Sequence, residues 1–321
     1  MTEAQRAFRL KMILSFTAVY LIWGSTYLAI RFAIETLPTF TMASVRFVIA
    51  GLVLYGWARW RGAKAPTGRQ WRHAAIIGGL LLLGGNGLVV WAEHYIPSGW
   101  AALLVGTEPL WIVLLLMLSR SGERPTPRTV FAIVVGFVGV AVLTAPGNSP
   151  EGGGLYWPAA VAVPLAALSW AIGSLYSRRA DMPESNPLAT SLQMLTGGAL
   201  LGLTGAGFGE FQNLDPSAFS LTSLAALAYL IVFGSLIAFS AYAWMVRNVD
   251  PTLVATYAYV NPVVAVILGW LFAGEPVGWR TLIAGGFILG AVALLSKRPR
   301  KVEKSEPEDE PVALSEPCAA G

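Results

Sequence analysis

Two polar residues that each precede a proline are the ones best suited to chemistry in this sequence. Glu108 comes directly before Pro109, and Asn261 comes directly before Pro262, and both pairs lie inside long apolar runs. A carboxylate in the middle of a membrane helix costs roughly 2.5–3.5 kcal/mol, so Glu108 should face the protein interior and hold a partner or a proton. It could carry a coupling proton, bind a cationic substrate group or form a structural ion pair.

Two arginines could complement that carboxylate or bind an anionic group of a substrate. Arg31 ends the first predicted helix, and Arg46 lies one turn inside the second. An arginine at a helix end often extends its charge to the membrane surface, which is the favoured interpretation of Arg31. Arg46 lies deeper, and for it a substrate contact and an ion pair with Glu108 stay equally open.

Neutral polar and aromatic groups accompany these charges. Tyr257 lies one helical turn before Asn261, so the phenol and the amide share a face and could hydrogen-bond a substrate without a net charge. Hydrogen bonds between helices are the alternative role for both groups. Trp111 lies on the same helical face as Glu108, which makes it a candidate for the same site.

Three further residues are candidates for the wall of a cavity because they lie within predicted helices. Trp23 and Trp170 lie well inside their helices, whereas a tryptophan near a helix end is usually an interfacial anchor. Asn86 lies among three glycines, which permit a close helix approach or a wet wall. For the glycines themselves, helix packing is the preferred interpretation.

The two prolines predict kinks near the middle of their helices. Each lacks an N–H, so the carbonyl groups of Val105 and Ala258 lose their helical partners. Such a carbonyl must find another donor or face a wet cavity. We therefore predict a pair of kinked helices at Pro109 and Pro262 that flank a central site and take part in gating, with a packing kink as the alternative.

The composition says what kind of protein must position these residues. Of 321 residues, 55% are hydrophobic and 12% are charged, and the mean hydropathy is +0.61. A soluble domain carries roughly 25% charged residues. Apolar runs of about 20 residues, each able to cross a bilayer core of roughly 30 Å, recur along the chain. The sequence predicts an all-α polytopic membrane protein.

Ten transmembrane helices fit these apolar runs. We expect them at about 13–31, 41–58, 73–93, 98–119, 129–145, 155–177, 188–207, 222–246, 252–273 and 278–296. The chain then divides into a cytoplasmic N-terminus (1–12), a first five-helix repeat (13–146), a periplasmic linker (147–154), a second repeat (155–296) and a disordered cytoplasmic tail (297–321).

Charge and repetition predict how the halves insert. With the N-terminus in the cytoplasm, 19 of the 22 lysines and arginines fall in cytoplasmic segments, which also places the C-terminus inside. The stretch from Trp91 to Pro109 has an echo 153 positions later, from Trp244 to Pro262. An odd number of helices per half inverts the second repeat, which is a recurrent transporter design.

Several kinds of chemistry are excluded. The single cysteine, Cys318, permits no disulfide framework and no thiol metal site, and His73 and His94 have no metal-ligand spacing. The chain lacks a P-loop and the common hydrolase and dinucleotide motifs. We therefore expect no metal, no cofactor and no enzymatic activity, with any energy coming from an ion gradient or from the substrate's own gradient.

The motifs resemble those of a known family. The matching residues are Trp23-Gly24-Ser25-Thr26-Tyr27, Arg46-Phe47, Ala50-Gly51, Pro109 and Gly122-Glu123 in the first half, and Ser169-Trp170, Gly173-Ser174, Tyr257 to Ala265 and Gly274-Glu275 in the second. They are similar to the two EamA-type repeats of the drug/metabolite transporter (DMT) superfamily. The turns at Ala92-Glu93-His94 and Arg247-Asn248-Val249 resemble those of YedA-type exporters within it. The resemblance covers roughly residues 13–296.

This resemblance implies a ten-helix inner-membrane transporter with a central cavity, usually an exporter of small metabolites. Substrates in the superfamily include amino acids, nucleotide sugars, amines and drugs, so membership does not fix the cargo. Many relatives have an uncharged residue before the helix-4 proline, where this chain has Glu108. In the second half Gln193 takes the place of Arg46, so the halves should not bind symmetrically.

The leading hypothesis is a secondary transporter that exports amino acids, amines or drugs by alternating access. The expected partners are a small-molecule substrate, the lipid bilayer and protons, with no nucleic acid; a homodimer stays open. An uncoupled channel or facilitator shares nearly every sequence feature. An intramembrane lipid-linked transferase is disfavoured because Asp181, Asp215 and Asp250 are isolated, whereas such enzymes need clustered acids, a His or a Cys.

Overall fold

The computed structural model describes residues 3–118, 126–145, 156–212, 214–249, 251–254 and 256–296. Within these ranges the chain is helical and contains no strand. The predicted linker at 147–154, the tail at 297–321 and the Gly122-Glu123 motif lie outside them. In the first half the helices are α1 (Glu3–Thr17), η1 (Ala18–Trp23), α2 (Gly24–Ala33), α3 (Thr39–Trp60), α4 (Gly68–Gly78), η2 (Gly79–Gly87), α5 (Leu88–Ala92), α6 (Ser98–Val105), α7 (Glu108–Leu118) and α8 (Pro127–Leu143).

The second half has the same character. Its helices are α9 (Trp157–Ser177), α10 (Asn186–Gly207), η3 (Pro216–Ala218), α11 (Leu221–Tyr229), η4 (Leu230–Ala238), α12 (Phe239–Asn248), α13 (Pro251–Val254), α14 (Tyr257–Ala273) and α15 (Trp279–Ser296). Several of these join end to end, so α1, η1 and α2 form one long helix, as do α4, η2 and α5, and α11, η4 and α12. Each of the ten predicted ranges is largely helical in the structure.

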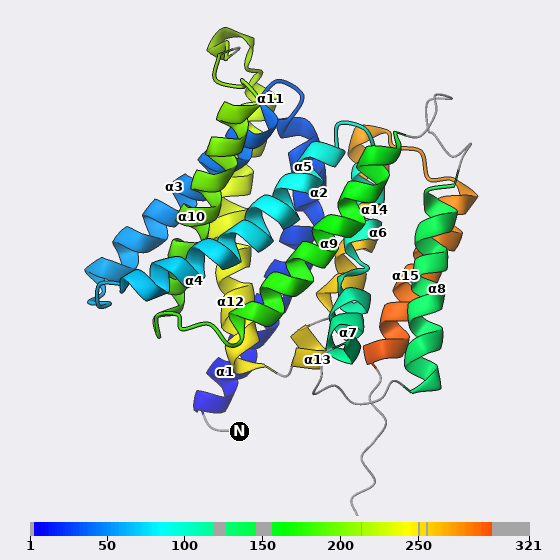
Figure 1. Cartoon of the computed structure of the whole chain (residues 1–321), viewed down its shortest axis with the longest axis horizontal. Coiled ribbons are helices and arrows are strands. Elements are labelled where there is room, and N and C mark those ends of the chain that lie inside the picture. Colours follow the sequence, from blue (N-terminus) through cyan, green and yellow to red (C-terminus); the bar gives the residue numbers. More distant parts are fainter. Residues whose placement is uncertain are drawn as a thin grey trace, which may run out of the picture.

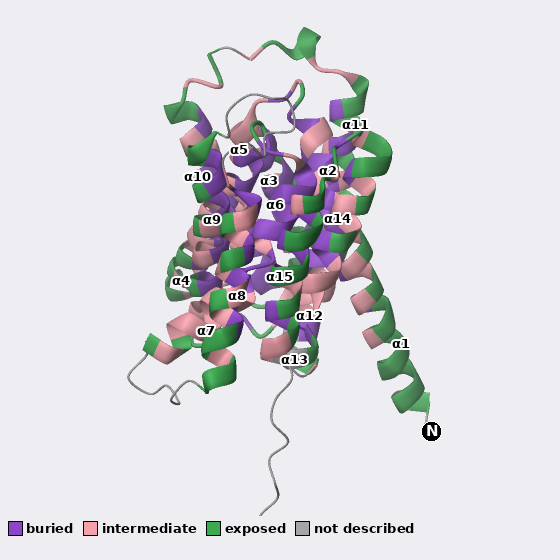
Figure 2. Ribbon diagram, turned by 90° about the vertical axis from the view of Figure 1, so that its right-hand side faces the viewer, coloured by how far each residue is buried: buried purple, intermediate pink, exposed green. Residues whose placement is uncertain are grey.

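Two of the predicted helices differ from the structure, one in where it begins and one in its continuity. The first helix begins at Glu3 and not near residue 13, because residues 3–12 are mostly good helix formers. Figure 2 shows this part of α1 as an exposed extension beyond the bundle. The fourth predicted helix, 98–119, is broken into α6 and α7 by a turn at Gly106 and Thr107. Helix propensity is weakest there, because a glycine and a threonine directly precede the Glu108-Pro109 pair.

Glycines set how closely the helices pack. In Figure 1, α3 runs alongside α10 at one side of the bundle and α8 alongside α15 at the other. A Cβ on Gly198 would lie 2.9 Å from Val48, and one on Gly139 would lie 2.9 Å from Ile288. Small residues therefore bring these helices together closely, as in membrane bundles, where association depends on tight van der Waals contact.

The exterior is apolar and the interior is closely packed. Figure 2 shows buried residues gathered around α2, α3, α6 and α14, while exposed residues lie on the outside. Many exposed residues are large and apolar, among them Trp60, Leu118 and Leu203. In water such a surface would be unfavourable, whereas hydrocarbon chains solvate it. The surface therefore fits a protein embedded in lipid.

Helix length and composition support the membrane assignment in part. Six helical stretches are long and apolar enough to span a bilayer: Gln5–Ala33, Thr39–Trp60, Gly68–Ala92, Ser98–Leu118, Trp157–Ser177 and Leu221–Met245. Three apolar helices, Pro127–Leu143, Tyr257–Ala273 and Trp279–Leu295, are shorter. The glycines and threonines of α10 lower its hydropathy. The exact number of crossings and the inverted repeat stay predictions.

Carboxylates from the second half cap helices of the first at one end of the bundle. In Figure 1 the N-terminus and the last turn of α15 lie at the same end, and we call the opposite end the far end. There the Glu210 carboxylate accepts hydrogen bonds from the backbone N–H groups of Phe40 (3.0 Å) and Thr41 (2.7 Å), at the start of α3. Glu275 does the same for the start of α6. A carboxylate at a helix N-terminus satisfies free N–H groups and complements the helix dipole.

Candidate functional site

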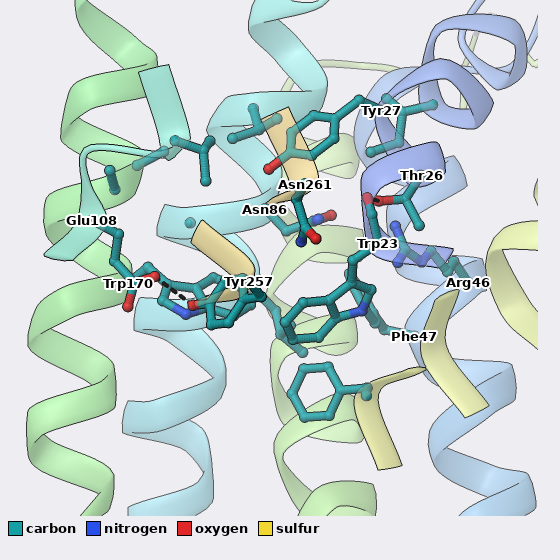
Figure 3. Close-up of a pocket in the computed structure, with 18 residues that line it drawn as sticks. Trp23, Thr26, Tyr27, Arg46, Phe47, Asn86, Glu108, Trp170, Tyr257 and Asn261 are labelled. Carbon is teal, nitrogen blue, oxygen red and sulfur yellow. Dashed lines mark hydrogen bonds between the residues drawn. The ribbon is translucent and has the colours of Figure 1, made fainter. Parts of the chain in front are cut away.

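A central pocket brings together residues from seven of the ten predicted helical ranges (Figure 3). The space between its lining atoms amounts to about 740 Å³, counted together with the part that is open to solvent. Its lining residues are Trp23, Thr26, Tyr27, Ile30, Arg46, Phe47, Leu82, Gly85, Asn86, Val89, Val105, Glu108, Ala166, Ala167, Trp170, Phe239, Tyr257 and Asn261. Seven of the residues that the sequence proposed for a site therefore face one cavity.

Glu108 is positioned by the break in the fourth predicted helix. It is the first residue of α7, and its side chain is only 4% exposed. Side chains lean toward the N-terminus of a helix, so a residue at its first position points out from the helix start, here into the pocket. The first turn also favours a negative charge, because the free N–H groups of the helix lie there. The Tyr257 hydroxyl donates a hydrogen bond of 2.5 Å to Glu108 Oε2.

Arginine does not pair with this carboxylate. Among the described residues, neither Arg46 nor Arg31 has a nitrogen within 4.0 Å of a Glu108 oxygen. Arg31 instead donates from Nη1 to the backbone oxygen of Glu93, at 3.0 Å. Arg46 donates from Nε to Ser235 Oγ, at 2.9 Å. The structural ion pair that the sequence left open for Glu108 is therefore not formed in this conformation.

Aromatic side chains form one wall of the pocket. The indole of Trp23 makes edge-on contacts with Trp170, Phe239 and Tyr257, with ring centroids 5.6–6.3 Å apart. Its Nε1 donates to the backbone oxygen of Gly234, at 3.2 Å, which satisfies the polar end of the ring. The rings therefore make an apolar surface against which the body of a small molecule can pack.

Local π-helical turns place part of this wall. Residues Ala18–Trp23, Gly79–Gly87 and Leu230–Ala238 adopt π-helical turns within longer helices. Such turns are rare and occur often at functional sites, because they widen the helix and redirect side chains. Trp23 lies in the first of them and Asn86 in the second. The third supplies Gly234 and Ser235, which hold Trp23 and Arg46.

The two asparagines have different surroundings. With its nitrogen directed toward η1, the Asn261 amide donates to the backbone oxygens of Tyr20 (3.2 Å) and Val19 (3.3 Å). This is the interhelical bonding that the sequence offered as an alternative. Asn86 Oδ1 is buried and has no hydrogen-bond partner among the described residues. It stays available to a donor group that enters the pocket.

Two predicted site residues, Trp111 and Pro109, lie differently from expectation. Trp111 is not part of the pocket lining, and its ring packs edge-on against Phe137 of α8, with centroids 4.9 Å apart. Pro109 lies in the first turn of α7, where a missing N–H costs nothing, so it does not kink a continuous helix. Pro262 does lie inside a helix, α14. The two prolines are therefore not structurally equivalent.

Some lining residues were not singled out from the sequence. Thr26, Tyr27 and Phe47 belong to motifs that were recognised, and helical spacing from Trp23 could have pointed to the first two. Phe239 and the supporting Ser235 carry no such signal, because they lie in a continuous apolar run.

Glu93 is a further buried acid that the sequence reasoning did not use. Its side chain is 0% exposed, and neither carboxylate oxygen has a hydrogen-bond partner among the described residues. The backbone oxygen of the same residue accepts the hydrogen bond from Arg31, so Glu93 lies beside a cation without pairing with it through its carboxylate.

Comparison with known proteins fits this arrangement. The model of the EamA-like transporter family matches the chain twice, at residues 10–145 and 157–297. The chain belongs to this family. It is therefore a membrane transporter of the drug/metabolite transporter superfamily, as the motifs indicated.

Individual relatives match along nearly the whole chain. It is 40% identical over 280 residues to the uncharacterized inner membrane transporter YedA of Escherichia coli K12, covering 87% of this chain and 88% of that one. Protein PecM of Dickeya dadantii is 25% identical over 299 residues, covering 90% and 95%. A solved crystal structure at 25% identity superposes with a TM-score of 0.61, covering 89% of this chain and 96% of that one.

Proposed function

We propose that this transporter exports small organic metabolites by alternating access and that Glu108 carries the coupling proton. The observation that carries the proposal is a carboxylate buried in the central pocket and bonded to a phenol, with no arginine in ion-pair distance. A buried acid without a fixed counter-ion can gain and lose a proton as the pocket changes its access. The repeated match to one family model supports two inverted halves that exchange conformations.

Orientation and location are part of the same proposal. The excess of basic residues in alternate loops supports cytoplasmic termini, and both ends of the described chain lie at one end of the bundle. The far end would then face the periplasm. The name of the relative YedA supports an inner membrane location. We therefore propose a multi-pass inner-membrane protein with both termini in the cytoplasm.

The test is accumulation in inverted membrane vesicles, measured with labelled amino acids, amines and cationic dyes, with and without a proton gradient. Accumulation that is lost when the gradient collapses supports a proton-coupled exporter. Equilibration that ignores the gradient would instead support an uncoupled facilitator. Glu108→Gln should abolish uphill transport while the protein still reaches the membrane and stays folded.

A further inference from the structure

The guanidinium group of Arg46 is buried in the pocket wall, and only its Nε has a hydrogen-bond partner among the described residues. Its side chain is 4% exposed, its Nε donates to Ser235 Oγ, and its Nη1 is buried without a hydrogen-bond partner among the described residues. A buried charge with an unpaired donor is costly to the fold. Such a group is best explained by an anionic partner that binds during the transport cycle.

No acid of the described chain serves as that partner in this conformation. No carboxylate oxygen lies within 4.0 Å of an Arg46 nitrogen in the described ranges. The side chain of Glu93 is also buried, and neither of its carboxylate oxygens has a hydrogen-bond partner among the described residues. Glu108 is bonded to Tyr257 and lies across the pocket from Arg46 (Figure 3). The positive charge of Arg46 is therefore not compensated by a contact.

The surrounding helix is built to hold this guanidinium in place. A Cβ on Gly234 would lie 3.0 Å from Arg46 Nη2, so the backbone of η4 passes close to the guanidinium group at this point. The next residue, Ser235, accepts the Nε hydrogen bond. The ring of Phe47 lies 4.7 Å from Arg46 Cζ and supports it from its own helix. Nη1 and Nη2 are left without a hydrogen-bond partner among the described residues.

We propose that Arg46 binds a carboxylate group of the cargo, with Ser235 as the positioning residue for the guanidinium. The planar guanidinium matches a carboxylate in two parallel hydrogen bonds, which a lysine cannot reproduce. The apolar body of the cargo packs against the rings around Trp23, and Glu108 lies on the far side of it (Figure 3). This inference rests on the proposed transport function, because it names the chemistry of the transported molecule.

Three labelled compounds that share a phenylethyl group test the proposal. They are 3-phenylpropionate, which has only the carboxylate, phenethylamine, which has only the amine, and phenylalanine, which has both. Binding is measured by scintillation proximity on the purified full-length protein in detergent. We expect both carboxylate compounds to bind. The one that binds more tightly shows whether the cargo is an acid or a zwitterion.

The variants identify the group that recognises the carboxylate. Arg46→Gln should weaken the binding of both carboxylate compounds by roughly tenfold or more, the size expected for a lost charge-assisted hydrogen bond. Arg46→Lys should keep only part of the wild-type affinity. Ser235→Ala should weaken the binding of the same two compounds severalfold. Arg59→Gln, an exposed arginine on the same helix, is the matched control and should change nothing. Arg46→Gln should leave any phenethylamine binding unaltered.

Distinct results overturn the two proposals. Equal binding of carboxylates to wild type and Arg46→Gln, binding of phenethylamine alone, or no binding of any of the three compounds overturns the role of Arg46. Carboxylate binding that depends on Arg46, but transport that ignores the proton gradient, overturns the coupling proposal and leaves this one standing.

Discussion

The carboxylate of Glu275 accepts hydrogen bonds from the backbone N–H groups of Ser98 (2.7 Å) and Gly99 (3.1 Å), and so joins the end of α14 to the start of α6. Gly274 makes this reach possible, because its φ of +64° ends α14 in the left-handed region that glycine adopts freely. Glu275 comes from the second family match and α6 from the first. The two hydrogen bonds therefore join the two halves at the far end.

We expect this junction to hold the far end closed, and Glu275→Gln should loosen it, because the substitution removes the negative charge that complements the start of α6. The readout is labelling of a cysteine placed at Val89, a pocket residue, in a chain whose only cysteine has been replaced by Cys318→Ser. An impermeant maleimide added at the far end should react roughly threefold faster or more in the variant. Glu35→Gln, an exposed acid after α2, is the control. Equal rates in Glu275→Gln and the control would mean that the contact does not hold the end closed.

The contact between Tyr257 and Glu108 predicts non-additive effects on coupling. Tyr257→Phe removes the hydroxyl that donates to the carboxylate, so uphill transport should fall roughly tenfold. Because Glu108→Gln already abolishes uphill transport, the cycle is measured on downhill flux. If the two groups act as a unit, adding Tyr257→Phe to Glu108→Gln should slow downhill flux little further. Tyr259→Phe, on the same helix, should keep wild-type transport. If the two losses simply multiply, the residues do not work together.

Much of this arrangement could be predicted from the sequence, and the reasons are local. Apolar runs fix the helices, and a polar group inside such a run must turn inward, which is why Glu108, Asn86 and Asn261 lie together. The break before Glu108 was missed because the long apolar runs on both sides outweighed the weak helix propensity of Gly106 and Thr107. Because α7 begins anew after this break, Trp111 no longer shares the continuous helical face that the sequence suggested. Its ring packs against α8 and does not line the pocket.

Long-range partners could not be predicted in the same way. Ser235 lies 189 residues from Arg46, and nothing in the apolar run around it indicates which arginine it meets. Their contact depends on the register of two helices, which close packing at glycines such as Gly234 decides. A single sequence gives the faces of helices but not their register against one another.

The prolines should differ in their effect on transport. Pro262 lies inside α14, close to Gly106 at the α6–α7 break. A Cβ on Gly106 would lie 3.3 Å from the Pro262 ring and 3.2 Å from the Ala258 carbonyl oxygen. Pro262→Ala restores the N–H that can bond this carbonyl, so α14 should stiffen where the two segments meet. We expect slower transport with nearly unchanged binding.

Pro109→Ala should have a smaller effect, because proline is already favoured in a first turn. Paired binding and flux measurements on both variants check this. Equal losses of transport in the two proline variants would contradict this prediction and support the symmetric pair of kinks that the sequence predicted.

Close helix packing predicts a stability difference between two glycines of α10. A Cβ on Gly197 would lie 2.8 Å from the Gly78 backbone oxygen and from Leu82, so Gly197→Ala must push α10 away from its neighbour. Overpacking of this kind costs roughly 1–3 kcal/mol. Gly207, at the end of the same helix, has no atom within 4 Å of the added carbon, so Gly207→Ala should be neutral or slightly stabilising. Thermal unfolding of both variants in detergent measures the difference. Equal midpoints would show that this crossing has room to spare and that the glycines of α10 are not what holds the bundle together.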